Sequence, residues 1–266
     1  MLDSYNRKIN YLRISITDRC NLRCTYCMPE TGIKQYNHDD ILKFEEIRDF
    51  LIIAAKNGIN KIRLTGGEPL VRKGILTLVE MLSHIEGIED FALTTNGILL
   101  NNFAFPLKKA GLHRINISLD TINPIKYALI TRGGDITKVF EGIEAAKHSG
   151  LLPIKINCVI NKSSEEKDAK EVSEFCKKNN LSIRFIHKMD LKKGEFTTVE
   201  GGDGGNCIAC NRLRLTANGK LKPCLFNDLE FDIRELGYEQ AFNLAVKLKP
   251  KCGKVNNINA FNNIGG

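Results

Sequence analysis

Tryptophan is absent from this 266-residue sequence, and aromatic residues make up only 7% of it. Lysine and arginine outnumber the acidic residues, which gives a formal net charge of +8, but they never form a run of four. Without such a run, or a basic stripe interleaved with aromatics, nucleic acid is not the partner that the charge favours. Basic residues directed at a phosphate-bearing substrate fit the composition better.

Long apolar segments are also missing. No run of about 18 apolar residues occurs, so we expect no membrane-spanning helix. The first residues, MLDSYNRKINYL, are polar and charged and lack the apolar segment of a secretory signal. We therefore expect a cytoplasmic protein, in which thiols stay reduced and disulfides are rare.

Cysteine is the residue that the chain has in excess, with nine copies. Clustered cysteines in a reducing compartment indicate metal binding. Scattered ones, such as Cys158 and Cys176, are expected in the core. Two groups are clustered, and their members are Cys20, Cys24, Cys27, Cys207, Cys210 and Cys224.

Apolar periodicity predicts alternating strands and helices as far as residue 190. The helices are expected from 44 to the stop at Gly58 and over 75–84, 99–110, 139–146 and 164–178, and the strands over 12–16, 59–64, 91–93, 115–119, 153–160 and 183–186. Such units imply parallel strands joined by right-handed crossovers. The pattern predicts an α/β fold, either a full or partial barrel or an open doubly wound sheet.

Polar motifs follow the predicted strands, and in either architecture the carboxyl ends of the strands carry the functional site. The cysteine loop follows the first strand, and Gly66-Gly67-Glu68 follows the second. Residues 94–97 follow the third strand, and Ser118 and Asp120 end the fourth. The sequence therefore predicts one site at one rim.

Three thiolates in the first loop are too few for a structural zinc ion, which takes four ligands. His38 lies beyond Pro29 and Gly32 at no usual zinc-finger spacing. An iron–sulfur cube is held by cysteine thiolates, and three of them leave one iron open to bind a reactant. We interpret the missing fourth thiolate as the functional feature of this loop.

The spacing C-x3-C-x2-C, with Tyr26 before the last cysteine, resembles the radical S-adenosylmethionine (SAM) superfamily. The resemblance implies a partial (β/α)6 TIM-like barrel and a [4Fe-4S] cluster on the loop. It also implies cleavage of SAM to a 5′-deoxyadenosyl radical. The implied SAM contacts are Tyr26, Gly67, Glu68, Thr95, Asn96, Ser118, Asp120 and Met189.

The second cysteine group has the spacing C-x2-C-x13-C, which suits a second cluster with an open iron. Asn218-Gly219 predicts a hairpin turn between RLRLT and KLKPC. Arg212 and Arg214, two residues apart on a strand, share one face and suit a phosphate or the polar edge of a purine. Cys252 keeps an alternative open, because it could close a four-cysteine zinc or cluster site.

Longer motifs resemble the GTP 3′,8-cyclases of molybdenum cofactor biosynthesis. They are LRISITDRCNLRCTYCMP, KIRLTGGEPLVR, LTTNG, RINISLD, RLRLT and the terminal IGG. The resemblance divides the chain into a radical SAM core barrel over 1–190 and a small C-terminal domain over 191–266 that carries the second cluster. It implies GTP bound between two [4Fe-4S] clusters, each with three cysteine ligands, and a lyase reaction that removes the ribose 3′ hydrogen and forms 3′,8-cyclo-GTP.

The same resemblance assigns residues and partners. It implies catalytic roles for Arg212, Arg214 and the terminal Gly265-Gly266, which would reach into the active site. It implies a low-potential electron donor, flavodoxin or ferredoxin, and a downstream cyclic pyranopterin synthase. The implied GTP contacts are Arg13, Lys61, Arg63, Lys155, Arg184, Arg212 and Arg214.

One departure from the family leaves other hypotheses open. Only 16 residues separate Asp190 from Cys207, several tens fewer than in the family members. The second hypothesis is therefore a related radical SAM enzyme with an auxiliary cluster that acts on a peptide or another nucleotide. The third is a non-enzymatic module that binds zinc or nucleic acid.

Overall fold

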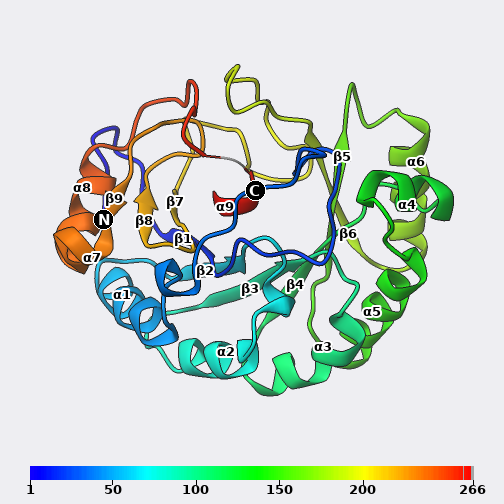
Figure 1. The fold of residues 1–266 in the computed structure, drawn as a ribbon, viewed down its shortest axis with the longest axis horizontal. Helices are drawn as coiled ribbons and strands as arrows, with labels where there is room; N and C mark the ends of the chain where they lie inside the picture. The colour runs from blue at the N-terminus through cyan, green and yellow to red at the C-terminus, as the bar shows by residue number, and fades with distance from the viewer. Residues whose placement is uncertain (260, 265–266) are drawn as a thin grey trace.

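A single curved sheet forms the centre of the computed structural model, which describes residues 1–259 and 261–264 (Figure 1). The strand order is β6-β5-β4-β3-β2-β1-β7-β8-β9, so β6 and β9 are the edges of the sheet. The strands are β1 (Tyr11–Ser15), β2 (Lys61–Thr65), β3 (Asp90–Thr95), β4 (Arg114–Ser118), β5 (Lys155–Ile160), β6 (Ser182–His187), β7 (Arg212–Leu215), β8 (Lys220–Lys222) and β9 (Phe231–Asp232).

Helices follow the strands and cover the outer face of the sheet, as Figure 1 shows. The α-helices are α1 (Phe44–Lys56), α2 (Ile75–Ser83), α3 (Leu100–Lys109), α4 (Pro124–Thr131), α5 (Ile136–His148), α6 (Lys167–Lys178), α7 (Ile233–Leu236), α8 (Tyr238–Lys247) and α9 (Phe261–Ile264). Two short 3-10 helices are η1 (His38–Asp40) and η2 (Pro69–Val71).

The first six strands are parallel, and the sheet does not close on itself. The predicted α/β partial barrel is therefore confirmed. Alternate residues of each strand face the helices, and there they form one apolar core that includes Leu12, Ile62, Phe91 and Ile115. The other face, which includes Tyr11 and Arg13, is directed into the barrel, where polar side chains collect.

The helix α4 has no counterpart among the predicted elements. Its apolar residues Ile125 and Leu129 are 73% and 68% exposed, so they carry no amphipathic signal that points to the core. Asn123-Pro124 nevertheless marks the start of the helix, since the Asn123 side chain accepts from the Lys126 N–H at 3.0 Å. This N-cap is the sequence feature from which the helix could have been predicted.

The C-terminal strands continue the sheet of the barrel. β7 pairs in parallel with β1, so Leu213 lies beside Leu12, and the predicted hairpin joins β7 to antiparallel β8. The division into domains at residue 190 stays a prediction. Within the described part of the chain, no helix is long and apolar enough to cross a membrane.

We expect Leu213→Ala to destabilise the whole fold, because Leu213 is fully buried where the hairpin joins the barrel. Loss of a buried leucine side chain costs about 2–5 kcal/mol. Urea denaturation should record this loss in a single transition, and Ile125→Ala, at an exposed position, should change stability little. Separate unfolding of the C-terminal strands would contradict an integral sheet.

Candidate active site

Two cavities open inside the barrel. The first lies along the carboxyl ends of the strands, whereas the second is lined by the first residues of β1 to β5 and of β7, at their amino ends. The prediction of one site at one rim therefore describes the first cavity only. The first has a volume of about 200 Å³ and the second about 320 Å³. Asn157, Ile186 and Met189 line both cavities. They are therefore two compartments of one chamber, with strands β5 and β6 along their common side.

The first cysteine group lies on a loop that hydrogen bonds hold against α4. The Thr25 N–H donates to Ile130 O at 2.9 Å, and the Arg23 N–H donates to Thr131 O at 3.2 Å. Within the loop, the Cys27 N–H donates to Cys24 O at 3.0 Å. All three thiols of this group line the first cavity.

A glycine turn brings Glu68 to the same loop. The Gly67 N–H donates to Thr17 O at 2.7 Å, and the Glu68 N–H donates to Arg19 O at 2.8 Å. A Cβ on Gly67 would lie 2.3 Å from Arg19 O, which no side chain can tolerate. The absence of a side chain at Gly67 thus lets the second strand dock directly against the stem of the cysteine loop.

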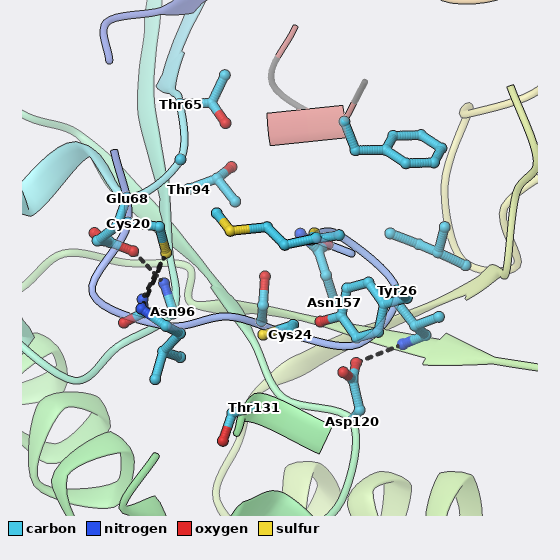
Figure 2. Close-up of a pocket in the computed structure, with 18 of the residues that line it drawn as sticks. Cys20, Cys24, Tyr26, Thr65, Glu68, Thr94, Asn96, Asp120, Thr131 and Asn157 are labelled. Carbon is cyan, nitrogen blue, oxygen red and sulfur yellow. Dashed lines mark hydrogen bonds between the residues drawn. The ribbon is translucent and has the colours of Figure 1, made fainter. Parts of the chain in front are cut away.

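Glu68 is 1% exposed and accepts three hydrogen bonds, from the Leu70 N–H, the Thr95 hydroxyl and the Asn96 N–H. Burial raises the pKa of its carboxyl to about 7, although these hydrogen bonds oppose the rise. The carboxylate is thus fixed in position and poised to accept from a cationic or N–H-bearing ligand. Figure 2 shows it beside Cys20 and Asn96.

Tyr26 and Asp120 lie on the opposite side of the first cavity (Figure 2). Asp120 accepts from the Val159 N–H at 2.8 Å, and the Tyr26 hydroxyl donates to its carboxylate. Burial raises the pKa of Asp120 to about 6. This pair gives the wall a polar edge for a ligand that bears hydroxyl or amino groups.

The donor set of the first cavity fits an iron–sulfur cluster. Burial raises the pKa of Cys20 to about 11 and those of Cys24 and Cys27 to about 12, so the thiols ionise readily only when a metal supplies positive charge. Within residues 1–259 and 261–264, no group of three His, Cys, Asp or Glu side chains could hold a single metal ion. A cube, whose irons are spread out, accepts thiolates that lie further apart.

All eight predicted SAM contacts line the first cavity. They come from the cysteine loop, from the turns after β2 and β3, from the end of β4 and from the segment after β6. His38, the other residue considered as a ligand, lies outside this cavity against the Arg19 guanidinium, with Nη1 and the ring Nε2 2.9 Å apart.

Arginines stand side by side on the wall of the second cavity. Strand register pairs Arg13 with Arg63 on β2 and with Arg214 on β7. Neighbouring strands are about 4.8 Å apart, so three guanidinium-bearing residues form one row. Two residues away, Tyr11 lies between Lys61 and Arg212 in the next row.

Burial and the proximity of other cations make the charged state of the arginines in this row less favourable. Burial and the neighbouring guanidiniums hold the pKa of Arg13 well below its usual range and lower that of Arg214 to about 10. Arginine stays protonated in proteins, so the lowered pKa reflects the free-energy cost of crowding buried cations. Among the described residues, the buried Nε atoms of Arg63 and Arg212 and the Tyr11 hydroxyl have no hydrogen-bond partner. The wall is therefore suited to a multivalent anion.

All seven predicted GTP contacts line the second cavity together with the second cysteine group. Two carboxylates also line it, and Asp90 is already paired with Arg114 at 2.6 Å. The cations of the cavity far outnumber them. The cationic side chains are Arg13, Lys61, Arg63, Arg114, Lys155, Arg184, Arg212, Arg214 and Lys249.

Lys249 links the second cysteine group to the cationic wall. It is 2% exposed, and its ammonium donates to Arg212 O at 2.7 Å and to Pro223 O at 2.6 Å. Burial alone would raise the pKa of Cys210, but Lys249 and Arg212 bring it below its ordinary value. The thiol of Cys210 therefore faces a more electropositive surrounding than the thiols of the first group.

The short segment after Asp190 covers part of the second cavity. Its residues Phe196, Thr197, Val199 and 202–206 line that cavity. Phe196 stacks on Phe226 with ring centroids 4.3 Å apart, and Val199 and Gly204 are joined by a backbone hydrogen bond of 2.7 Å. Although this segment is short, it still forms one wall of the chamber.

The terminal Gly265-Gly266, predicted to be catalytic, lie outside the described residues. The preceding Ile264 is buried, and its carbonyl lies 3.5 Å from Arg214 Nη1. Helix α9 lies near the middle of the ring of strands in Figure 1, and its Phe261 lines the first cavity. The described end of the chain therefore contacts both cavities.

Several lining residues were not predicted. Tyr11 lies two residues before Arg13, and Arg114 lies two residues before Asn116 of the RINISLD motif. Residues two apart on a strand share a face, so this alternation could have identified both. Asn157, two residues after Lys155 on β5, could have been found in the same way. Lys249 follows a helix and carries no such signal.

The comparisons with known proteins agree with this geometry. A sequence profile of the radical SAM superfamily matches residues 14–176. A GTP 3′,8-cyclase of Moorella thermoacetica is 44% identical over 303 residues, which cover 94% of this chain and 94% of the relative. A GTP 3′,8-cyclase of Thermodesulfovibrio yellowstonii is also 44% identical, over 89% of this chain and 88% of the relative.

Solved structures show the same fold at low identity. Streptococcus suis SuiB, bound to the precursor peptide SuiA, superposes with a TM-score of 0.67 at 15% identity, over 91% of this chain and 65% of that chain. Methylornithine synthase superposes with a TM-score of 0.57 at 15% identity, over 76% of this chain and 61% of that chain. This chain thus spans slightly less than two thirds of these solved proteins.

The alignment with the Moorella relative extends over 303 positions although this chain has 266 residues, so that relative has several tens of residues without a counterpart here. This difference agrees with the short segment noted between Asp190 and Cys207. Identity above 40% over about nine tenths of the chain outweighs it. The chain belongs to the radical SAM superfamily and, within it, to the family of the GTP 3′,8-cyclases.

Proposed function

We propose that this protein is a GTP 3′,8-cyclase, a lyase that converts GTP to 3′,8-cyclo-GTP with SAM in the first step of molybdopterin formation. One observation carries the proposal: two groups of three cysteines line adjoining compartments of one chamber, and a row of arginines lies on its wall. A nucleoside triphosphate held in the second compartment would have its ribose directed towards the first.

Membership of the superfamily implies SAM and a [4Fe-4S] cluster, and Cys20, Cys24 and Cys27 are the residues that would hold that cluster. When bound, cluster and SAM supply a 5′-deoxyadenosyl radical able to remove a hydrogen from a ribose carbon. The protein's part is to orient SAM. The Glu68 carboxylate would accept from its amino group, while Asn96, Tyr26 and Asp120 would contact its polar groups.

The second cluster belongs to the proposal, with Cys207, Cys210 and Cys224 as its ligands. Three thiols around one compartment, beside the buried ammonium of Lys249, suit an anionic cluster. A three-cysteine site leaves one position for a substrate atom. The purine of GTP would lie there, and the 196–206 segment would exclude water from its outer side.

The triphosphate would neutralise the arginine row. Arg13, Arg63 and Arg214 form one row, Lys61 lies in the next row on β2, and Lys155 and Arg184 lie on β5 and β6. Bidentate guanidinium–phosphate hydrogen bonds fix orientation as well as charge. Positioning the ribose relative to SAM is then a consequence of holding the phosphates at fixed points on rigid strands.

The proposal also implies partners. A low-potential donor, such as flavodoxin or ferredoxin, would supply the electron for the first cluster. A cyclic pyranopterin synthase would take the product. Reduced thiols and such donors are found in the cytoplasm, which is the compartment that the proposal requires.

An anaerobic assay with reconstituted protein, SAM, dithionite and GTP tests the function. Mass spectrometry should detect 5′-deoxyadenosine together with a cyclised product of the same mass as GTP. Formation of 5′-deoxyadenosine with GTP untouched, and turnover of a peptide or another nucleotide instead, would establish the alternative. If the protein contained zinc but neither iron nor acid-labile sulfide, the result would support the hypothesis of a non-enzymatic module.

Cys24→Ala should abolish SAM cleavage, because the first cluster would lose one of its three ligands. Cys158→Ala, at a buried cysteine outside both groups, is the matched control and should retain cleavage. Quantified 5′-deoxyadenosine and iron content per chain are the readouts. Full SAM cleavage by the Cys24 variant would refute the assignment of the first site.

Arg212→Met should weaken GTP binding while both clusters assemble. One charge-assisted hydrogen bond contributes about 1.5–3 kcal/mol, or roughly 10- to 100-fold in affinity. Arg48→Met is the control, since Arg48 is half exposed and paired with Asp49 away from the chamber. Calorimetric titration with GTP measures the difference, and equal affinities would remove Arg212 from the substrate site.

The affinity for SAM should decrease as pH falls from about 8 to about 6. Burial raises the pKa of Glu68 to about 7, so below that pH the carboxyl is increasingly protonated and accepts more weakly from the SAM amino group. Equilibrium binding to the cluster-loaded enzyme measures this change. Glu68→Gln should bind SAM weakly across the whole range, and a variant that kept the wild-type pH dependence would contradict the role of Glu68.

A further inference from the structure

Cys252 is the cysteine of the C-terminal region that the proposed function leaves unused, yet its thiol lies against a thiol that the function requires. Cys252 Sγ is 2.8 Å from Cys207 Sγ. A disulfide bond joins sulfur atoms about 2.05 Å apart, so the two thiols need only a small movement to form one. Both cysteines are free in the structure.

The fold holds the two cysteines together through Arg7. Its guanidinium donates to Cys207 O at 2.8 Å, to Lys251 O at 3.0 Å and to Pro250 O at 2.7 Å. Asp3 fixes that guanidinium through an ion pair of 2.6 Å, and both side chains are buried. One buried cation thus ties the segment before Cys252 to the backbone of Cys207.

Glycine on the other side of Cys252 keeps the pair close to the second cysteine group. A Cβ on Gly253 would lie 3.2 Å from Cys224 Sγ and 2.6 Å from the Cβ of Phe226. The next residue is fixed by a hydrogen bond of 2.8 Å from the Lys254 N–H to Phe226 O. The turn that carries Cys252 is therefore held on both sides.

The position of Cys252 does not suit a fourth cluster ligand. Cys207, Cys210 and Cys224 line the second cavity, whereas Cys252 does not and is exposed to solvent. The irons of a cube direct their outer ligands away from one another, so two sulfurs at 2.8 Å cannot serve two different irons. The geometry favours a bond between the sulfurs over the four-cysteine site that the sequence left open.

We propose that Cys207 and Cys252 form a reversible disulfide in the cluster-free chain, which withholds Cys207 from the second cluster. The reaction is exchange with a low-molecular-weight disulfide such as oxidised glutathione. One S–S bond of the reagent breaks and one protein S–S bond forms. The two thiol protons leave with the two released thiols, and a dithiol reverses the exchange. The proposal rests on the proposed function only in assigning Cys207 to a second cluster.

This pair would protect a vulnerable site. When oxidation removes the cluster, Cys207 and Cys210 are left as a partly buried C-x2-C pair of free thiols that can oxidise further or cross-link. Bonding to the adjacent, exposed Cys252 places Cys207 in a form that a thiol can restore. The consequence is that iron returns to the second site only after reduction.

The test uses the full chain, stripped of iron under anaerobic conditions and then treated with oxidised glutathione. Peptide mass spectrometry should find Cys207 joined to Cys252 as the main protein disulfide. The oxidised chain should take up iron and sulfide for one cluster, and for two after dithiothreitol. Cys252→Ser should instead carry glutathione on Cys207 and form no such disulfide.

Arg7→Lys is a second variant. It weakens the Arg7 clamp, which is the set of hydrogen bonds from the Arg7 guanidinium to the carbonyls of Cys207, Pro250 and Lys251, without removing a cysteine. We expect its yield of the Cys207–Cys252 disulfide to fall at least several-fold. Equal or greater yield of disulfides between Cys207 and Cys210 or Cys224 in the wild type would overturn the proposal. So would loss of the second cluster's iron from reduced Cys252→Ser, which would make Cys252 a ligand. Disulfide mapping needs neither SAM nor GTP, so failure of the cyclase proposal leaves this result interpretable.

Discussion

Repulsion among arginines on adjacent strands determines what the chamber can bind. The parallel register places Arg13 between Arg63 and Arg214, and the latter two are each 7% exposed. This arrangement of like charges on adjacent strands carries a repulsive cost. It persists because the strands that carry it are fixed by an apolar core on their other face. The stability of that core is what would allow the proposed polyanion site to be assembled in advance of its ligand.

The same strands bring two distant cysteine groups to one chamber. The first group is held by the turn after β2, where Gly67 lets Glu68 dock on the stem of the loop, and by the end of α4. The second group reaches the chamber because β7 pairs directly with β1. Radical chemistry requires that reactive groups meet at fixed positions, and this pairing places both cysteine groups around one chamber within a single sheet.

Much of this could be predicted from the sequence because the signals were local. The alternating strands and helices and the Asn218-Gly219 turn each depend on short-range chemistry, and the fold bears them out. The strand-end motifs indicated one rim, and the residues they named line the first cavity, whereas the second cavity lies at the opposite, amino ends of the strands. The α4 helix was missed because its apolar side chains face solvent, and Lys249 and the Arg7 clamp were missed because their partners are carbonyls far away in the sequence. The contact of Cys252 with Cys207 depends on tertiary structure alone, so the sequence could only leave its role open.

In the proposed reaction, a radical generated beside the first cysteine group reaches a ribose held by the arginine row. Turnover of GTP that carries deuterium at C3′ of the ribose tests this most directly. We expect the 5′-deoxyadenosine formed to contain one deuterium derived from GTP, and the cyclised product to have lost it. Deuterium-free 5′-deoxyadenosine, formed at the same rate with and without GTP, would rule out hydrogen abstraction from this ribose.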